Sequence, residues 1–154
     1  MHIHKIQRNK TMQIARQTVV TPKLQKALVK LIYQLNPNSP APTIEHLEKV
    51  VGDENSVLFV LEEENEIVGT LSLVFYHIPT GRKAWIEDVV VDDKMRGRGF
   101  GKKLMEHAIA YARNEGVRKI YLSSNPTRIA ANGMYQSLGF EQYITNVYFY
   151  DLDK

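Results

Sequence analysis

The stretch that decides the fold is Arg96-Gly97-Arg98-Gly99-Phe100-Gly101. It follows an apolar run at residues 83–92, which predicts a central strand covered on both faces, and it precedes residues 101–115, whose apolar positions recur at helical spacing. Glycine lets a chain turn tightly between a strand and a helix, and the first amides of a helix have no partner inside it. We therefore expect this turn to bind phosphate groups.

Basic side chains add positive potential at this turn, from Arg96, Arg98, Lys102 and Lys103. A Walker-type loop is disfavoured, because it needs Ser or Thr after Gly101-Lys102, where this chain has Lys103. A dinucleotide fingerprint is disfavoured too, because it needs GxGxxG and the chain has GxGxG. A glycine-rich turn with a solvated basic face is the alternative that the loop by itself leaves open.

The rest of the chain alternates between helix and strand patterns. Two helices are predicted before the sheet, one from the Thr21-Pro22 cap to residue 35 and one at residues 43–52. Apolar and β-branched runs then predict a hairpin at residues 56–62 and 67–77, and a short buried strand at residues 119–122 that runs parallel to residues 83–92. A helix at residues 127–138 and a closing strand pair at residues 140–143 and 147–152 complete the prediction.

Length and composition fit one soluble domain with no metal. The chain has 154 residues, a formal charge of +3 and no cysteine, which excludes disulfides, thiolate metal sites and a cysteine nucleophile. The five histidines, at positions 2, 4, 46, 77 and 107, lack metal-ligand spacing. No apolar run is long enough to span a bilayer and residues 1–10 lack the apolar core of a signal peptide, so we expect a cytoplasmic protein.

Three segments, in order, resemble the GNAT superfamily of N-acetyltransferases: residues 86–91, residues 96–101 and residues 131–140. The last segment matches the family pattern with Ala131, Tyr135, Gly139 and Phe140. The resemblance implies a single N-acetyltransferase domain over residues 1–154, with acetyl-CoA as cosubstrate. It also implies an α/β (α+β) fold in which helices cover both faces of one mixed, mostly antiparallel, twisted sheet of about six to seven strands, with a splayed parallel strand pair at its centre.

The same resemblance implies which residues hold CoA. Main-chain groups of Val89, Val90 and Val91 pair with the pantetheine arm as an added strand would. Many members carry an asparagine seven residues before the tyrosine, where this chain has Arg128, so Asn125 and Asn132 are the substitutes for that polar contact. The pyrophosphate lies in the turn formed by Arg96, Gly97, Arg98, Gly99, Phe100, Gly101 and Lys102.

Acetyl transfer to an amine needs a base and an acid. An alkyl ammonium is only about one part in a thousand free amine at neutral pH, a deficit of roughly 4 kcal/mol, so a general base helps. Glu87 is the candidate base, because a carboxylate inside an apolar strand is costly unless it has a task; an ion pair with an inward Lys or Arg is the alternative. Because strand side chains alternate, Glu87 and Asp88 are expected on opposite faces.

The other groups come from the resemblance. Tyr135 lies beside the thiol of CoA and supplies the acid, although a tyrosine on a helix is also an ordinary core residue. The backbone N–H of Val89 or Val90 polarises the thioester carbonyl, by analogy with relatives. Since the chain has no cysteine, direct attack of the amine on the thioester is simpler than an acyl-enzyme.

The expected activity is transfer of an acetyl group directly to a primary amine of a small molecule or a protein. A non-catalytic acetyl-CoA-binding sensor is the alternative, but it would tolerate the loss of Glu87 and Tyr135, and both are present. We expect a small-molecule or peptide amine as acceptor, no nucleic-acid or membrane partner, and a monomer or homodimer. The loops that would select the acceptor carry no recognisable chemistry, so its identity stays open.

Overall fold

A computed structural model of the chain describes residues 11–154. Two predictions concern residues 1–10 and lie outside the described residues: that His2 and His4 bind no metal, and that this segment lacks the apolar core of a signal peptide. The chain divides into two compact units, residues 1–123 and residues 124–154, and each is described by itself.

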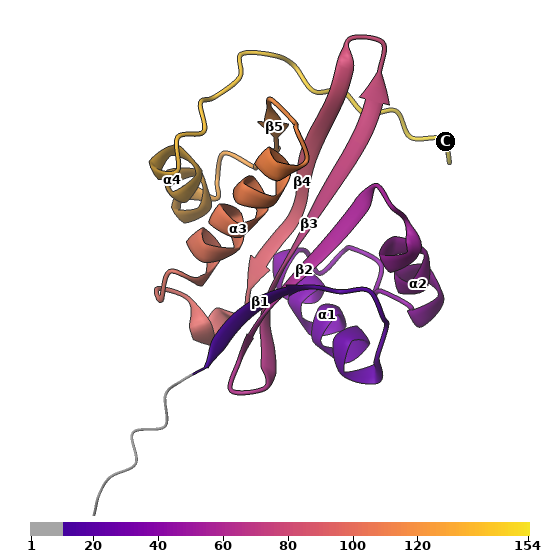
Figure 1. The fold of residues 1–154 in the computed structure, drawn as a ribbon, viewed down its shortest axis with the longest axis vertical. Coiled ribbons are helices and arrows are strands. Elements are labelled where there is room, and N and C mark those ends of the chain that lie inside the picture. Colours follow the sequence, from indigo (N-terminus) through magenta and orange to yellow (C-terminus); the bar gives the residue numbers. More distant parts are fainter. Residues whose placement is uncertain (1–10) are drawn as a thin grey trace, which may run out of the picture. The chain divides into compact units, whose positions relative to one another are not determined.

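The first unit contains one five-stranded sheet, in the order β1-β2-β3-β4-β5 (Figure 1). The pairs β1–β2, β2–β3 and β3–β4 are antiparallel, and β4 and β5 are parallel, as predicted for the strands on either side of the glycine loop. The short edge strand β1 was not predicted. The strands are β1 (Met12–Arg16), β2 (Ser56–Glu63), β3 (Glu66–Ile78), β4 (Gly81–Val91) and β5 (Ile120–Tyr121).

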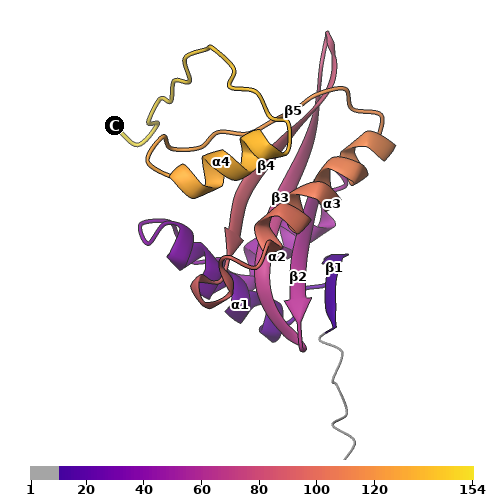
Figure 2. The same cartoon turned by 90° about the vertical axis from the view of Figure 1, so that its left-hand side faces the viewer.

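Helices cover both faces of this sheet, as expected (Figure 1 and Figure 2). On one face lie α1 (Pro22–Leu35) and α2 (Ile44–Gly52), and on the other lies α3 (Phe100–Asn114). Both predicted caps of the first two helices are confirmed, because the Thr21 and Thr43 side chains each accept a hydrogen bond of 3.1 Å from a first-turn amide. Gly116 ends α3 with a left-handed φ of 75°.

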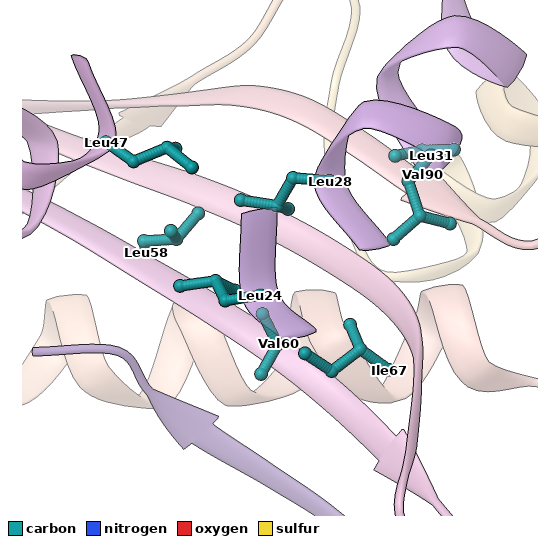
Figure 3. Packing of buried hydrophobic residues seen from close by; sticks show 8 residues of the cluster. All are labelled: Leu24, Leu28, Leu31, Leu47, Leu58, Val60, Ile67 and Val90. Atoms are coloured by element: carbon teal, nitrogen blue, oxygen red, sulfur yellow. The ribbon is translucent and has the colours of Figure 1, made fainter. Parts of the chain in front are cut away.

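Alternation along β2 divides its side chains between the two helical layers. Leu58 and Val60 belong to the cluster under α1 and α2, whereas Phe59 makes edge-on ring contacts with His107 and Tyr111 of α3, at centroid distances of 4.8 and 5.4 Å. Each face of the sheet therefore has its own apolar core. Figure 3 shows the first of them, formed by Leu24, Leu28, Leu31, Leu47, Leu58, Val60, Ile67 and Val90.

Two predictions about burial in β4 and β5 are wrong in part. In β4, Ala84, Ile86 and Val90 are buried, but Glu87 and Asp88 are exposed, so the strand is covered on both faces only over part of its length. The strand predicted at residues 119–122 is reduced to the two half-buried residues of β5. No helix within residues 11–154 is both long and apolar enough to cross a membrane.

The second unit contains α4 (Ile129–Ser137), which lies within the predicted helix. The closing strand pair predicted at residues 140–143 and 147–152 is wrong, because residues 140–150 form no regular secondary structure. The described sheet therefore has five strands, and the expected six to seven are not reached. The reason is physical: a β-rich run becomes a strand only when a neighbouring strand pairs with it, and here Ile144, Tyr148 and Phe149 are 86–99% exposed.

Candidate active site

The glycine loop between β4 and α3 has a backbone that other residues would resist. Gly97 and Gly99 have φ values of 78° and 77°, in the left-handed region that L side chains rarely adopt. A Cβ atom added at either position meets nothing within 4 Å, so space is not the constraint. The backbone conformation is thus the reason that glycine is favoured at these two positions.

The loop ends where α3 presents its unpaired amides. Gly99 is the N-cap of α3 and provides no side-chain hydrogen bond to the helix. The Lys103 N–H donates to the Gly99 carbonyl at 3.1 Å, so the amides of the residues between them belong to the first turn, where a helix offers no internal acceptor. These amides and the positive end of the helix dipole fit an anion such as a phosphate.

The basic side chains of the loop have different surroundings. Arg98 is engaged with the Glu63 carboxylate at the end of β2: its Nη1 donates to Oε2 at 2.5 Å and its Nη2 to Oε1. This pairing raises the pKa of Arg98 above its ordinary value. Arg96 pairs at 2.7 Å with Asp93, with both side chains more than half exposed, and Lys102 and Lys103 are exposed. The positive charge that was expected from Arg98 is thus neutralised by the Glu63 carboxylate.

A second ion pair anchors the chain where β4 ends. The buried Asp92 carboxylate accepts a hydrogen bond from Lys30 of α1 at 2.5 Å and caps the short 3-10 helix η1 (Asp93–Met95) through the Lys94 amide at 3.1 Å. Gln34, also in α1, accepts from the Asp93 amide at 3.0 Å. The Lys30 hydrogen bond is the main cause that lowers the pKa of Asp92, while burial opposes it. The glycine loop is therefore tied to α1 just before it begins.

β4 contains a β-bulge at the point where the candidate base lies. Between two register pairs, Thr70 with Val90 and Ser72 with Glu87, a single residue of β3 faces Asp88 and Val89 of β4. Asp88 has a φ of 50°, in the left-handed region. A bulge disrupts the hydrogen-bond ladder locally and bends the strand, so main-chain groups near Asp88 are released from regular pairing.

The bulge also decides which face of the sheet carries Glu87. Residues that pair directly lie on the same face, and Val90 belongs to the cluster under α1 and α2. Glu87 pairs with Ser72, two residues after Thr70, and therefore lies on that same face. Simple alternation across four residues would have placed Glu87 and Val90 on opposite faces, which is why the sequence pattern could not reveal this arrangement.

The carboxyl group of Glu87 has a raised pKa. Partial burial is the largest cause, the nearby Asp88 charge adds to it, and a hydrogen bond from the Trp85 side chain opposes both. Trp85 itself stacks on Tyr121 of β5, with ring centroids 5.9 Å apart and planes 14° from parallel. A carboxyl group with a raised pKa and an aromatic neighbour is suited to accept a proton near neutral pH.

The parallel pair of strands is short and lies at the edge of the described sheet, not at its centre as predicted, because no further strand pairs with β5 among the described residues. The register of β4 and β5 has two pairs, Ala84 with Ile120 and Trp85 with Tyr121, and β5 ends there while β4 continues to Val91. The edge of β4 at Val89, Val90 and Val91 is therefore not paired with β5. This is the arrangement that an extended ligand needs in order to add to a strand edge.

The remaining predicted residues belong to the second unit. The Asn132 Nδ2 donates to the Asn125 carbonyl at 3.0 Å, and the Asn125 Oδ1 accepts from the Thr127 amide at 2.9 Å, so both asparagines stabilise the turn before α4. Tyr135 is buried and meets Phe140 edge-on at 6.2 Å. Burial raises the pKa of Tyr135, and the Arg128 charge opposes that shift.

Sequence reasoning did not single out Glu63, Asp92 or Lys30. Each contacts a partner at least 35 positions away in the chain, and no local pattern reports such a pairing. Among residues 11–154 there is no group of three or more His, Asp or Glu side chains placed to hold a metal ion.

Comparison with known proteins decides the family. The profile of the Acetyltransferase (GNAT) family matches residues 25–140, which include most of α1, all of α2, the strands β2 to β5, the glycine loop and α4. The chain belongs to the GNAT family. The resemblance based on three short segments is thus confirmed, and it extends to the helices that precede the sheet.

Two curated proteins are similar to this GNAT chain. The uncharacterized N-acetyltransferase YhdJ of Bacillus subtilis is 35% identical over 107 residues, which is 66% of this chain and 74% of the relative. Human N-acetyltransferase 8B is 33% identical over 89 residues, 56% of this chain and 39% of the human protein. The chain thus spans well under half the length of the human relative.

Solved structures agree on the fold. The aminoglycoside N-acetyltransferase AAC(6')-Iy in complex with CoA matches with a TM-score of 0.80 at 18% identity, covering 96% of this chain and 99% of that one. At this level of identity the match establishes the GNAT-like fold of the chain and nothing about its substrate.

Asp92→Asn should destabilise the protein in a pH-dependent way. The lowered pKa of Asp92 means that its ion pair stabilises the fold above the ordinary aspartate pKa of about 3.9, and that this contribution disappears as the pH falls through the lowered value. We expect a loss of about 1–3 kcal/mol at pH 7, measured by urea unfolding, that shrinks as the pH falls below about 4.

The exposed pair of Glu45 and Lys49 provides the control, because Glu45→Gln should change the free energy of unfolding by no more than about 0.5 kcal/mol. A loss that is the same at pH 3 and pH 7 would show that the charge of Asp92 does not stabilise the fold.

Proposed function

We propose that this GNAT protein is an acetyl-CoA-dependent N-acetyltransferase that transfers an acetyl group directly to a primary amine. The observation that carries the proposal is the loop at Gly97 and Gly99, which offers the first-turn amides of α3 to an anion. CoA carries a pyrophosphate, which fits this chemistry, and acetyl-CoA supplies the thioester to be attacked.

Residues of three segments are proposed to hold CoA. The turn formed by residues 96–102 takes the pyrophosphate through its main-chain amides, and the edge of β4 at residues 89–91 pairs with the pantetheine arm. By the resemblance, Asn125, Asn132 and Tyr135 contribute from the second unit. Each of these asparagines has one side-chain atom that already forms a hydrogen bond in the turn before α4, the Asn125 Oδ1 and the Asn132 Nδ2.

Glu87 is proposed as the general base, directly or through a water molecule. Its raised pKa brings its proton affinity closer to that of an amine than an ordinary glutamate would allow. The bulge places the group on the face of the sheet shared with α1 and α2. We propose that the amine acceptor approaches on this face.

The bulge has a second role in the proposal. A tetrahedral intermediate develops negative charge on the former carbonyl oxygen of the thioester, and backbone amides that are already oriented stabilise such a charge. The N–H groups of Val89 and Val90 lie in and beside the interrupted ladder. We propose one of them as the donor to this oxygen.

Tyr135 is proposed as the acid that protonates the departing thiolate, a role carried over from the resemblance. Its raised pKa keeps the hydroxyl protonated at neutral pH, as a proton donor must be. The proposed acceptor is a small-molecule or peptide amine.

The test of this function is a panel of primary amines incubated with acetyl-CoA, with turnover followed by release of free thiol. The protein has no cysteine, so it contributes no thiol background. Acetylation of at least one amine, confirmed by mass spectrometry, is the expected result. Tight CoA binding without turnover on any amine would favour a CoA-binding sensor instead.

Gly99→Ala should markedly reduce the thermal stabilisation that CoA confers, because an alanine costs about 1–2 kcal/mol at the φ of 77° that shapes the turn. For the wild type, CoA at about 100 times its dissociation constant should add about 2.7 kcal/mol to the free energy of unfolding. The matched control is Gly52→Ala, at an open position without a left-handed φ, which should retain the full effect of CoA. Full stabilisation of Gly99→Ala would count against the loop as the binding site.

Glu87→Gln should lower turnover by about 100-fold or more and remove the rise of activity with pH that the base produces. In the wild type this rise should lie above the ordinary glutamate pKa, because partial burial and Asp88 raise the value. Asp88→Asn keeps a residue that tolerates positive φ and should move the rise to lower pH. An unchanged pH profile in Glu87→Gln would assign the base to another group.

Tyr135→Phe should lower kcat by about 100-fold while the affinity for CoA stays near that of the wild type, because the ring that meets Phe140 is retained and only the hydroxyl is lost. Tyr150→Phe, at an 84% exposed position, is the matched control and should leave both values unaltered. Wild-type turnover in Tyr135→Phe would remove the acid role.

A further inference from the structure

Glu63 is a buried carboxylate next to the candidate site, and the mechanism above does not use it. It lies at the last position of β2, before the turn to β3, with 6% of its surface exposed. Burying a carboxylate is costly unless strong hydrogen bonds compensate. Here the guanidinium of Arg98 provides two of them, one from each terminal nitrogen, in the bidentate arrangement that suits a planar fork.

Arg98 is held from two further directions. Its guanidinium carbon lies 4.6 Å from the centroid of the Phe100 ring at the start of α3, and its Nη1 lies 3.2 Å from the Met95 sulfur of η1. The side chain thus contacts the elements on both sides of the loop and the end of β2. Arg98 also separates the two left-handed glycines, so holding it restrains the peptide units that shape the turn.

An arginine in a glycine-rich loop is normally interpreted as a direct phosphate ligand, and here the contacts favour another role. To reach a phosphate with the same two N–H groups, Arg98 would have to break both hydrogen bonds to a buried carboxylate. Arg96 has no such obstacle, because its partner Asp93 is three positions away and both side chains are more than half exposed.

We propose that Glu63 is a positioning residue, and that the bidentate Glu63–Arg98 pair holds the loop in the shape that binds the pyrophosphate. The inference rests on the proposed function and goes beyond it, because it assigns Arg98 to the support of the loop and leaves the main-chain amides, with Arg96, as the phosphate contacts. A loop that adopts the binding shape only one-tenth of the time binds its ligand about tenfold more weakly.

The decisive variant is Glu63→Gln, because the two roles of Arg98 predict opposite results. Glutamine has only one side-chain oxygen, and its NH2 group would meet an N–H donor of Arg98. The bidentate pair is therefore lost. If the pair positions the loop, the dissociation constant for CoA, measured by calorimetry, rises about tenfold and KM for acetyl-CoA rises with it. If Arg98 instead contacts phosphate, releasing it from Glu63 leaves binding unchanged or makes it tighter.

Arg98→Lys tests the same pair independently, at a side chain that is only partly buried. Lysine keeps the charge but cannot form the fork. Positioning by the pair predicts weaker CoA binding, similar to that of Glu63→Gln, with a double variant no weaker than either single one. A direct phosphate contact predicts that lysine binds CoA nearly as well as the wild type. In both single variants, kcat at saturating acetyl-CoA should stay within about twofold of the wild type.

Two matched controls separate this role from general damage to the fold. Glu62→Gln alters the neighbouring carboxylate, which faces Lys23 at 3.8 Å. Arg82→Lys alters an arginine with similar contacts, 4.4 Å from the Phe75 ring centroid and 3.1 Å from Glu115, in a pair away from the loop. Both should bind CoA as the wild type does.

The outcomes also separate the two proposals. A wild-type protein that does not bind CoA overturns both the function and this inference. Wild-type binding, together with unchanged or tighter binding in Glu63→Gln, overturns the inference alone. If Glu63→Gln does not fold, as judged by circular dichroism, Arg98→Lys decides: near-wild-type affinity overturns the inference, and about tenfold weaker binding with kcat retained supports it.

Discussion

The chain must turn from β4 into α3 through two left-handed residues, and the rest of the candidate site depends on that turn. The same backbone that favours glycine at Gly97 and Gly99 exposes the first amides of α3, where no helical carbonyl can reach them. Glycine makes this shape accessible but does not hold it, because glycine is also the most flexible residue. Other parts of the molecule have to hold it.

Three contacts from separate elements provide that support. Lys30 and Gln34 of α1 fix the chain at Asp92 and Asp93 before the loop. Glu63 of β2 fixes Arg98 within it. After the loop, α3 lies so close to the sheet that a Cβ at Gly69 would come within 3.0 Å of Leu104. Because the Asp92 and Glu63 carboxylates are buried, their ion pairs restrain the loop more strongly than surface ion pairs would.

The bulge in β4 shows how one extra residue changes the chemistry of a strand. It releases main-chain groups beside Asp88 from regular pairing and places Glu87 on the same face as Val90. The partial shielding of Glu87, together with the charge of Asp88, then raises the pKa of its carboxyl group. A regular strand with the same composition would have neither the released amides nor this orientation.

Local sequence patterns predicted the helices and most of the strands, and they indicated the family of this protein. The caps at Thr21 and Thr43, the hairpin and the glycine loop each depend on neighbours in the chain, and all are confirmed. Tertiary structure alone decided which strands form a ladder, so the runs at residues 140–143 and 147–152 were wrongly predicted as strands and β1 was missed. It also decided the bulge and the partners of Arg98 and Asp92. The reason is that strand pairing, register and buried ion pairs join residues far apart in sequence, and a local pattern contains no information about which distant partner is present.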